Sequence, residues 1–428
     1  MNNKIFKGLY LALATTAMIG FTACEDEPDK YEISEGSPTI RYIRPVNVEA
    51  ADSIITGAYM DNNICIVGEN LRSITKMFFN DQEAKLIPSL ITDNTMIVTV
   101  PGQIPGEVFN KIFMVNNSND TTTYDFSVLV PGPNINNMSN EWAKAGETAT
   151  IYGNYFVDDP NVPLSLSING RKIDIDEFTI STITFTVPEG LAEGPIEIST
   201  VYGKKKAKFN YHDTNGMLFN DWGTYDAGDK STGLTNHGWH NQLIVSDENS
   251  LDGSYLFLGD CDVDNDTWAD GNLAFEYWPG DWDGTFTGTN ARLSDLVSFT
   301  DFANMALKFE VNIPSSNPWT NLSMQCIFSG DEQVTLLTAN NSFFNGTDYP
   351  RGLWTPWNAT GSYDTGGKWV TVTLPFSTFK YKHDGTPASV PLTASNFTGL
   401  TLFVWKGVTS GTTCHPIIRI DNVRAVAY

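Results

Sequence analysis

Two stretches of this sequence repeat the same order of strand and turn signals, about 86 residues apart. In the first, an apolar run at residues 64–71 leads to a Val-Pro pair at residues 100–101; in the second, residues 149–156 lead to Val-Pro at residues 187–188. Each stretch contains short alternating runs of β-branched residues separated by turn residues, which is the pattern of a small antiparallel sandwich. The chain is therefore expected to contain two such sandwiches in tandem.

The part of the chain from residue 217 to residue 428 has a different composition, because it holds ten of the eleven tryptophans. It contains alternating strands at residues 306–313, 369–376 and 400–405, and helical periodicity is scarcely visible. A two-sheet jelly roll accommodates many strands of this length. The sequence therefore predicts an all-β chain, with two immunoglobulin-like sandwiches followed by a larger β-sandwich of the jelly-roll kind.

Several of these tryptophans stand among glycine and proline, notably in the segments Trp278-Pro-Gly-Asp-Trp282 and Trp354-Thr-Pro-Trp357. Pro and Gly belong to turns rather than to packed strand interiors. An exposed indole can stack on the flat C–H face of a pyranose while polar neighbours bond its hydroxyls. These clusters indicate a sugar-stacking surface, and the alternative for each tryptophan is a place in the core.

The first residues have the pattern of an export signal. Two lysines precede an apolar run that ends in small residues before Cys24, so residues 1–23 are expected to be cleaved as a signal peptide. The position of Cys24 resembles a bacterial lipoprotein lipobox, in which this cysteine carries the lipid. Residues 25–29 are acidic, and we expect residues 24–37 to form an acidic tether. An ordinary cleaved signal with an unrelated cysteine is the alternative.

Charge and cysteine spacing exclude several classes of function. The formal net charge of −24 and the pI near 4.4 argue against a nucleic-acid partner, because such binding needs basic patches. The four cysteines after Cys24 form no CxxC pair, so the spacing of a zinc or thiol-redox site is missing. We expect buried free thiols, and a disulfide among Cys261, Cys326 and Cys414 is the alternative.

Two joints divide the chain. Pro131-Gly132-Pro133 separates the two sandwiches, and residues 212–216 separate the second sandwich from the tryptophan-rich part of the chain. Prolines at such joints stiffen a linker. We expect sandwiches at residues 38–131 and 132–212, acting as spacers, and a C-terminal domain at residues 217–428.

The two repeats resemble IPT/TIG domains, which carry a glycine-containing turn after the first strand and a Val-Pro near the middle. Together, the lipobox, the acidic stretch, the tandem units and the aromatic-rich terminal domain resemble the surface glycan-binding proteins of Bacteroidetes polysaccharide-utilisation loci. Within these, the chain is similar to the second glycan-binding lipoprotein of xyloglucan and mixed-linkage β-glucan systems.

This resemblance implies a non-catalytic lipoprotein on the exterior face of the outer membrane, which captures a β-glucan for uptake beside a TonB-dependent transporter. It also implies that two or three aromatic residues of the terminal domain form the binding platform. Trp319 follows a strand, and Trp354 comes thirty-five positions later, as in the platform of the family. The candidate glycan-binding residues are Trp319, Trp354, Trp357, Tyr349, Arg351, Trp278 and Trp282. Trp369 and Trp405 alternate within apolar strands and are expected in the core.

Asp262, Asp264 and Asp266 alternate along one acidic loop, and alternate carboxylates can converge on a calcium ion. The loop departs from the EF-hand pattern, since Thr267 stands where glycine belongs. A plain acidic loop is the first interpretation and a structural calcium the alternative. The sequence predicts no other cofactor.

Two other function classes compete with glycan binding. A glycoside hydrolase needs two carboxylates across the scissile bond, and the terminal domain contains only four glutamates and no recognised hydrolase motif. We therefore expect no enzyme activity. A surface adhesin, whose aromatic clusters would pack against a protein partner, is the stronger alternative.

Overall fold

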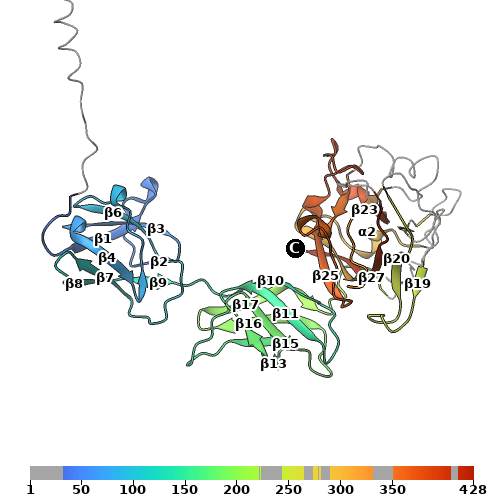
Figure 1. Ribbon diagram of the computed structural model, residues 1–428, viewed down its shortest axis with the longest axis horizontal. Coiled ribbons are helices and arrows are strands. Elements are labelled where there is room, and N and C mark those ends of the chain that lie inside the picture. The colour runs from blue at the N-terminus through green and yellow to red at the C-terminus, as the bar shows by residue number, and fades with distance from the viewer. Residues whose placement is uncertain are drawn as a thin grey trace, which may run out of the picture. The chain divides into compact units, whose positions relative to one another are not determined.

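The computed structural model of the chain describes residues 32–220, 222, 243–264, 273–277, 279–280, 290–330, 350–405 and 413–428 (Figure 1). The internal contacts divide the chain into two compact units, one ending at Pro131 and the other beginning at Gly132. The first unit is a single sandwich. The second unit contains another sandwich and the larger C-terminal domain.

The first sandwich packs the sheet β1-β3-β6 against the sheet β5-β4-β7-β8, and β2 pairs in parallel with β9. Apolar side chains alternate along the strands, so that Ile66, Phe79 and Ile112 meet between the sheets. The strands are β1 (Thr39–Pro45), β2 (Gly57–Tyr59), β3 (Asn63–Glu69), β4 (Ile74–Phe79), β5 (Gln82–Glu83), β6 (Thr95–Thr99), β7 (Lys111–Asn116), β8 (Thr121–Asp125) and β9 (Ser127–Leu129).

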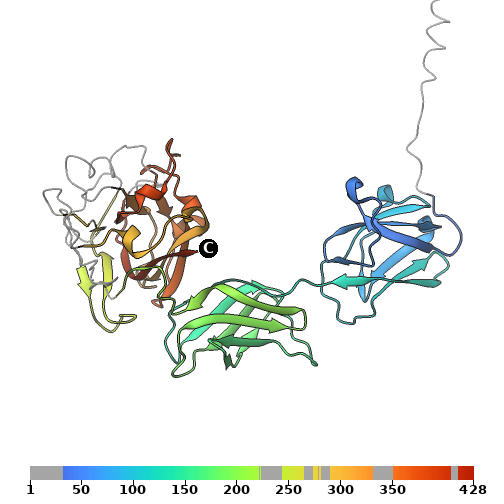
Figure 2. The ribbon, with the colours of Figure 1, turned by 180° about the vertical axis from the view of Figure 1, so that it is seen from behind.

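The second sandwich packs the sheet β10-β11-β15-β14 against the sheet β13-β12-β16-β17. Figure 2 shows the same two layers from behind. Ile151 and Ile183 from one sheet meet Leu166 and Ile198 from the other in its core. The strands are β10 (Asn134–Met138), β11 (Thr148–Asn154), β12 (Ser165–Ile168), β13 (Arg171–Ile173), β14 (Glu177–Phe178), β15 (Thr182–Thr186), β16 (Gly194–Thr200) and β17 (Gly203–Tyr211).

The C-terminal domain is a larger sandwich of the sheet β19-β20-β27-β22-β25, with β18 beside β27, and the sheet β21-β26-β23-β24. One large apolar cluster fills the space between them. The strands are β18 (Met217–Phe219), β19 (Leu243–Val245), β20 (Tyr255–Gly259), β21 (Ala274–Tyr277), β22 (Met305–Asn312), β23 (Met324–Ser329), β24 (Gly352–Trp354), β25 (Val370–Pro375), β26 (Gly399–Val404) and β27 (Ile417–Ala427). The predicted all-β fold class is confirmed.

Helices are short throughout the described residues. They are the α-helix α2 (Leu293–Leu296) and the 3₁₀ turns η1 (Val48–Ala50), η2 (Leu71–Ser73), η3 (Pro88–Leu90), η4 (Phe302–Asn304), η5 (Pro356–Ala359), η6 (Phe376–Thr378) and η7 (Ala394–Asn396). None of these helices has the length and hydrophobicity needed to cross a lipid bilayer.

The described cysteines are free thiols, as expected. Cys65, Cys326 and Cys414 are buried, and Cys261 is half-buried. Burial raises the pKa of Cys414 to about 12, so this thiol stays protonated at neutral pH.

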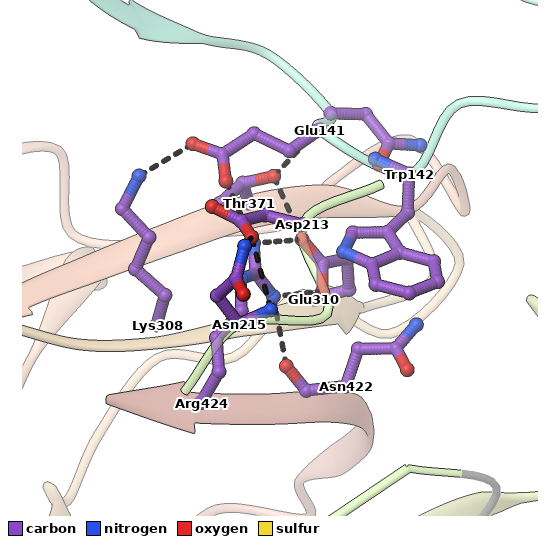
Figure 3. Close-up of polar contacts among 10 residues, drawn as sticks. Glu141, Trp142, Asp213, Asn215, Lys308, Glu310, Thr371, Asn422 and Arg424 are labelled. Atoms are coloured by element: carbon purple, nitrogen blue, oxygen red, sulfur yellow. Dashed lines mark hydrogen bonds and ion pairs between the residues drawn. The ribbon is translucent and has the colours of Figure 1, made fainter. Parts of the chain in front are cut away.

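A buried ionic cluster joins the second sandwich to the C-terminal domain (Figure 3). Glu141 accepts from Lys308 Nζ at 2.5 Å and from Arg424 Nη2 at 2.8 Å. Arg424 Nη1 donates to Glu310 Oε2 at 2.7 Å. All four side chains are at most 5% exposed, and their two positive and two negative charges cancel. Such burial is tolerated because each charge has a partner of opposite sign.

Apolar side chains also pack at this junction between the second sandwich and the C-terminal domain. Trp142 of the second sandwich clusters with Met217, Tyr255 and Trp369 of the C-terminal domain. The indole of Trp142 also stacks on His212, with ring centroids 4.7 Å apart and planes at 14°. The second sandwich and the C-terminal domain are therefore packed together, rather than joined only by the short linker that the sequence suggests.

Replacement of Glu141 by Ala leaves Lys308 and Arg424 buried without this carboxylate. We expect Glu141→Ala to lower the free energy of unfolding of the second unit by about 3–5 kcal/mol, measured by urea unfolding followed by tryptophan fluorescence. The matched control is Glu189→Ala, which removes an exposed carboxylate of the same sandwich and should change stability by less than about 0.5 kcal/mol. Equal effects of the two substitutions would contradict a stabilising role for the cluster.

Candidate functional site

The sheet β21-β26-β23-β24 has one face toward the core and one face away from it. Phe275 pairs with Leu402, which pairs with Cys326, so these three side chains share a face. Phe275 packs edge-on against Trp222, at 4.9 Å between centroids, and the indole of Trp222 donates to the carbonyl of Ile420 in the opposite sheet at 2.8 Å. This face is therefore the inner one, and the residues that alternate with it lie on the outer face.

The outer face combines polar and aromatic side chains. In register, Glu276 lies beside Thr401, and Gln325 lies beside Phe403. All four are buried, with exposures between 0 and 4%. Polar groups in such a place generally need hydrogen-bond partners, so the outer face of these strands is a buried polar layer, unlike the apolar inner face.

Arg351 and Gln325 form the centre of this face. Arg351 Nη1 donates to Gln325 Oε1 at 2.8 Å, and Gln325 Nε2 donates to the carbonyl of Trp405 at 2.6 Å. The backbone of Arg351 is held by the carbonyl of Tyr381 at 2.9 Å. The ring of His383 stacks on Trp405, with centroids 5.7 Å apart and planes at 16°. The guanidinium, the amide and the indole are therefore fixed relative to one another.

Glu276 is the only carboxyl residue within the four strands of this sheet. Burial raises its pKa from 4.5 to about 7. A single carboxyl does not provide the pair of carboxylates, roughly 5–10 Å apart, that glycoside hydrolysis uses. The strands of this sheet therefore lack the carboxylate pair that glycoside hydrolysis uses.

Three of the predicted platform residues lie in the core instead of on the surface. Trp319 is 1% exposed, and Trp354 and Trp357 are each 8% exposed. The structure brings Trp319 and Trp354 together, with centroids 5.4 Å apart, but between the sheets, where Trp354 also packs edge-on against Phe309. The prediction of an exposed platform at these three positions is wrong, because a buried indole presents no face to a sugar.

The neighbouring Pro and Gly residues explain this error. The indole of Trp357 donates to the carbonyl of Leu322 at 2.8 Å, and the turn η5 directs it inward. The indole of Trp319 donates to the carbonyl of Asn321 at 2.5 Å. Turn-forming residues determine the local backbone but not whether the adjacent indole points to solvent.

Arg351 is also buried, with 0% exposure, and its guanidinium is bonded to Gln325 instead of reaching into solvent. The prediction that the Arg351 guanidinium is available to bind a glycan is therefore wrong. Trp369 and Trp405 are buried, as expected. Tyr349, Trp278, Trp282 and Cys24 lie outside the described residues and stay predictions.

Sequence reasoning did not single out Gln325, Thr401 or His383. One signal was available for Gln325, because it stands alone as a polar residue in the otherwise apolar run Met324–Phe328. A lone amide in a buried strand indicates either a satisfied core group or a site. His383 has no such signal, because its stacking on Trp405 depends on a long-range contact.

The candidate calcium ligands are only partly described. Asp262 Oδ1 lies 2.9 Å from His415 Nδ1, and Asp260 Oδ1 lies 3.2 Å from His415 Nε2; these hydrogen bonds raise the pKa of His415. Among the described residues, no group of three or more His, Cys, Asp or Glu side chains could hold a metal ion. Asp266 lies outside those residues, so the structure supplies no argument for calcium at Asp262 and Asp264.

The raised pKa of Glu276 makes stability depend on pH. The folded state keeps a proton that the unfolded state releases above about pH 4.5, so stability falls as pH rises through this value toward 7. We expect Glu276→Gln, which stays neutral, to remove a decline of about 3 kcal/mol between pH 4 and 8. Urea unfolding at several pH values measures this difference, with the exposed Glu248→Gln as the control. Parallel pH profiles for Glu276→Gln and the wild type would contradict the assignment.

Comparison with known proteins identifies the family. Residues 211–427 match the family described as the surface glycan-binding protein B xyloglucan binding domain, and residues 133–214 match the IPT/TIG domain. The crystal structure of surface glycan-binding protein PbSGBP-B from Prevotella bryantii is similar over 92% of this chain and 99% of that chain, with 40% identity and a TM-score of 0.77.

A curated protein of Bacteroides ovatus, an IPT/TIG domain-containing protein, is 29% identical over 201 residues. That match covers 43% of this chain and 40% of the relative, so the chain spans less than half the length of this curated protein. The extent of the family match and the likeness to PbSGBP-B lead to the same assignment. The chain belongs to the surface glycan-binding protein B family, whose members bind glycans without cleaving them.

Proposed function

We propose that this chain is a cell-surface lipoprotein that binds a β-glucan of the xyloglucan or mixed-linkage type through its C-terminal domain. The observation that carries the proposal is the match of residues 211–427 to a xyloglucan binding domain. The likeness to the Prevotella surface glycan-binding protein, which extends over almost the whole of both chains, supports glycan binding at the cell surface.

The outer face of the sheet β21-β26-β23-β24 is the part of the domain to which we assign the ligand. The buried pair Arg351 and Gln325 fixes β23 and β24 relative to each other, so it can hold the aromatic residues next to these strands in place rather than contact the ligand itself. Trp278 directly follows β21, and Tyr349 stands three residues before β24, so two candidate aromatics are adjacent in sequence to strands of this sheet. Trp282, the third candidate aromatic, follows Trp278 in the same segment of the sequence.

Stacking on such aromatics provides the energy in this proposal. By analogy with base stacking, each aromatic contributes about 1–3 kcal/mol. Three of them would give an affinity between millimolar and micromolar, which needs roughly 4–8 kcal/mol. Modest affinity suits a protein that must hold a polymer and then release it.

The test is affinity electrophoresis of the full chain through gels containing xyloglucan, mixed-linkage β-glucan, laminarin, galactomannan or no polysaccharide. We expect retardation in a β-glucan gel, and a loss of at least about fivefold in affinity for each of Trp278→Ala, Trp282→Ala and Tyr349→Ala. Tyr59→Ala, which truncates a 51% exposed ring on the first sandwich, is the control and should migrate like the wild type. Free migration in all gels would overturn the β-glucan assignment and favour an adhesin.

The lipid anchor at Cys24 is a separate part of the proposal, supported by the lipobox-like sequence and the acidic residues after it. In this proposal, the lipid-anchored protein lies on the exterior face of the outer membrane. From the family resemblance we also propose a TonB-dependent transporter as its partner, which co-purification from membranes would reveal.

Fractionation of cells that express the full chain tests the anchor. We expect the wild type in the outer-membrane fraction, degraded by protease added to intact cells, and Cys24→Ser in the soluble fraction, because no lipid can be attached. The control is Cys261→Ser, which alters a half-buried free thiol and should stay with the membrane. Membrane retention of Cys24→Ser would exclude this cysteine as the anchor.

A further inference from the structure

A groove of about 600 Å³ runs between the second sandwich and the C-terminal domain. One wall is β10, at Asn134–Asn137, and the other is β25, at Thr371 and Thr373. Both strands are the edges of their sheets. A volume of this size lies within the roughly 300–1,000 Å³ range of small-molecule sites.

The walls of the groove are held in place by the buried junction. The backbone N–H of Thr371 donates to the carbonyl of Ser139 at 2.9 Å, and the Thr371 hydroxyl accepts from the backbone N–H of Glu141 at 2.8 Å. The same Glu141 belongs to the ionic cluster with Lys308 and Arg424. The groove is therefore preformed, and a ligand would not have to order its walls.

The buried part of the groove lining carries no unbalanced charge. Lys308 is bonded to Glu141, and its Nζ lies 4.5 Å from the ring centroid of Phe209. Both Lys308 and Phe209 are at most 5% exposed. The charge of Lys308 is thus balanced within the protein, and the buried side chains of Phe209 and Ile135 complete this part of the lining.

Neutral hydrogen-bonding groups form the walls. Asn134, Asn136 and Asn137 are exposed amides, and Asn134 Nδ2 donates to Asn136 Oδ1 at 2.6 Å. Amides donate and accept at adjacent atoms, which matches the alternating needs of vicinal sugar hydroxyls. Lys208 adds one exposed cation to the lining.

Tyr428 supplies an exposed ring at the same groove. Its side chain is 56% exposed, and its backbone N–H is fixed by the carbonyl of Asn304 at 2.8 Å. An aromatic ring with a polar tip, next to amides and hydroxyls, can stack on a pyranose and bond it at the same time.

We propose that this groove is a second carbohydrate-binding site, which takes a short segment of the same neutral polysaccharide. The proposal rests on the proposed function, because it assumes that the ligand is a glycan. Two sites on one packed unit would engage one polymer chain at two points. Binding to the polymer would then be tighter than binding to a short oligosaccharide at either site.

Isothermal titration of the full chain with a xyloglucan heptasaccharide, and separately with a mixed-linkage tetrasaccharide, counts the sites. We expect two oligosaccharides per wild-type chain. The double variant Asn137→Ala/Tyr428→Ala should weaken one site by about tenfold or more and leave the other unchanged. Both substitutions truncate exposed side chains, and an unchanged melting temperature confirms that the fold is retained.

The matched control is Phe178→Ala, which removes a 47% exposed ring on β14, at the opposite edge of the sheet from β10, and should bind like the wild type. Thr373→Arg, which places a long side chain inside the groove, should block the second site in the same way. A single site in the wild type, or two unchanged sites in both groove variants, would overturn the second site alone. Absence of any binding to the wild type would overturn the proposed function as well.

Discussion

The guanidinium of Arg424 is the group on which the second unit depends. Burial alone would lower its pKa, but the carboxylates of Glu310 and Glu141 raise the pKa above its ordinary value, so it remains charged. Glu310 belongs to the same domain as Arg424, whereas Glu141 stands 283 positions earlier, in the second sandwich. Because one buried cation needs carboxylates from two domains, neither domain satisfies its own charges when they are apart.

This dependence changes the role of the second sandwich. The outer face of β22 carries Lys308 and Glu310, which would be solvent-exposed charges if the C-terminal domain stood alone. The second sandwich covers these charges with Glu141, and its Trp142 packs against apolar side chains of the C-terminal domain. Its strand β10 also forms one wall of the groove. A domain whose sequence indicates a spacer thus also shapes a surface of its neighbour.

The residues of the candidate site could be predicted only in part. Alternation within strands correctly indicated that Trp369 and Trp405 are buried, since a two-residue period assigns each side chain to a face. The same kind of reasoning failed for Trp319 and Trp354, which flank turns, because a turn does not reveal what packs over it. Gln325 could not be singled out from the sequence, because its partner Arg351 comes next to it only through the pairing of β23 with β24.

The sequence by itself determined the all-β class and the tandem repeat, because strand periodicity and turn chemistry are local properties that short segments carry. Only the tertiary structure decided which aromatic rings are buried, which charges neutralise one another, and where a groove opens. These depend on contacts between residues far apart in the chain, as between Glu141 and Arg424, and such contacts exist only once the sheets have packed.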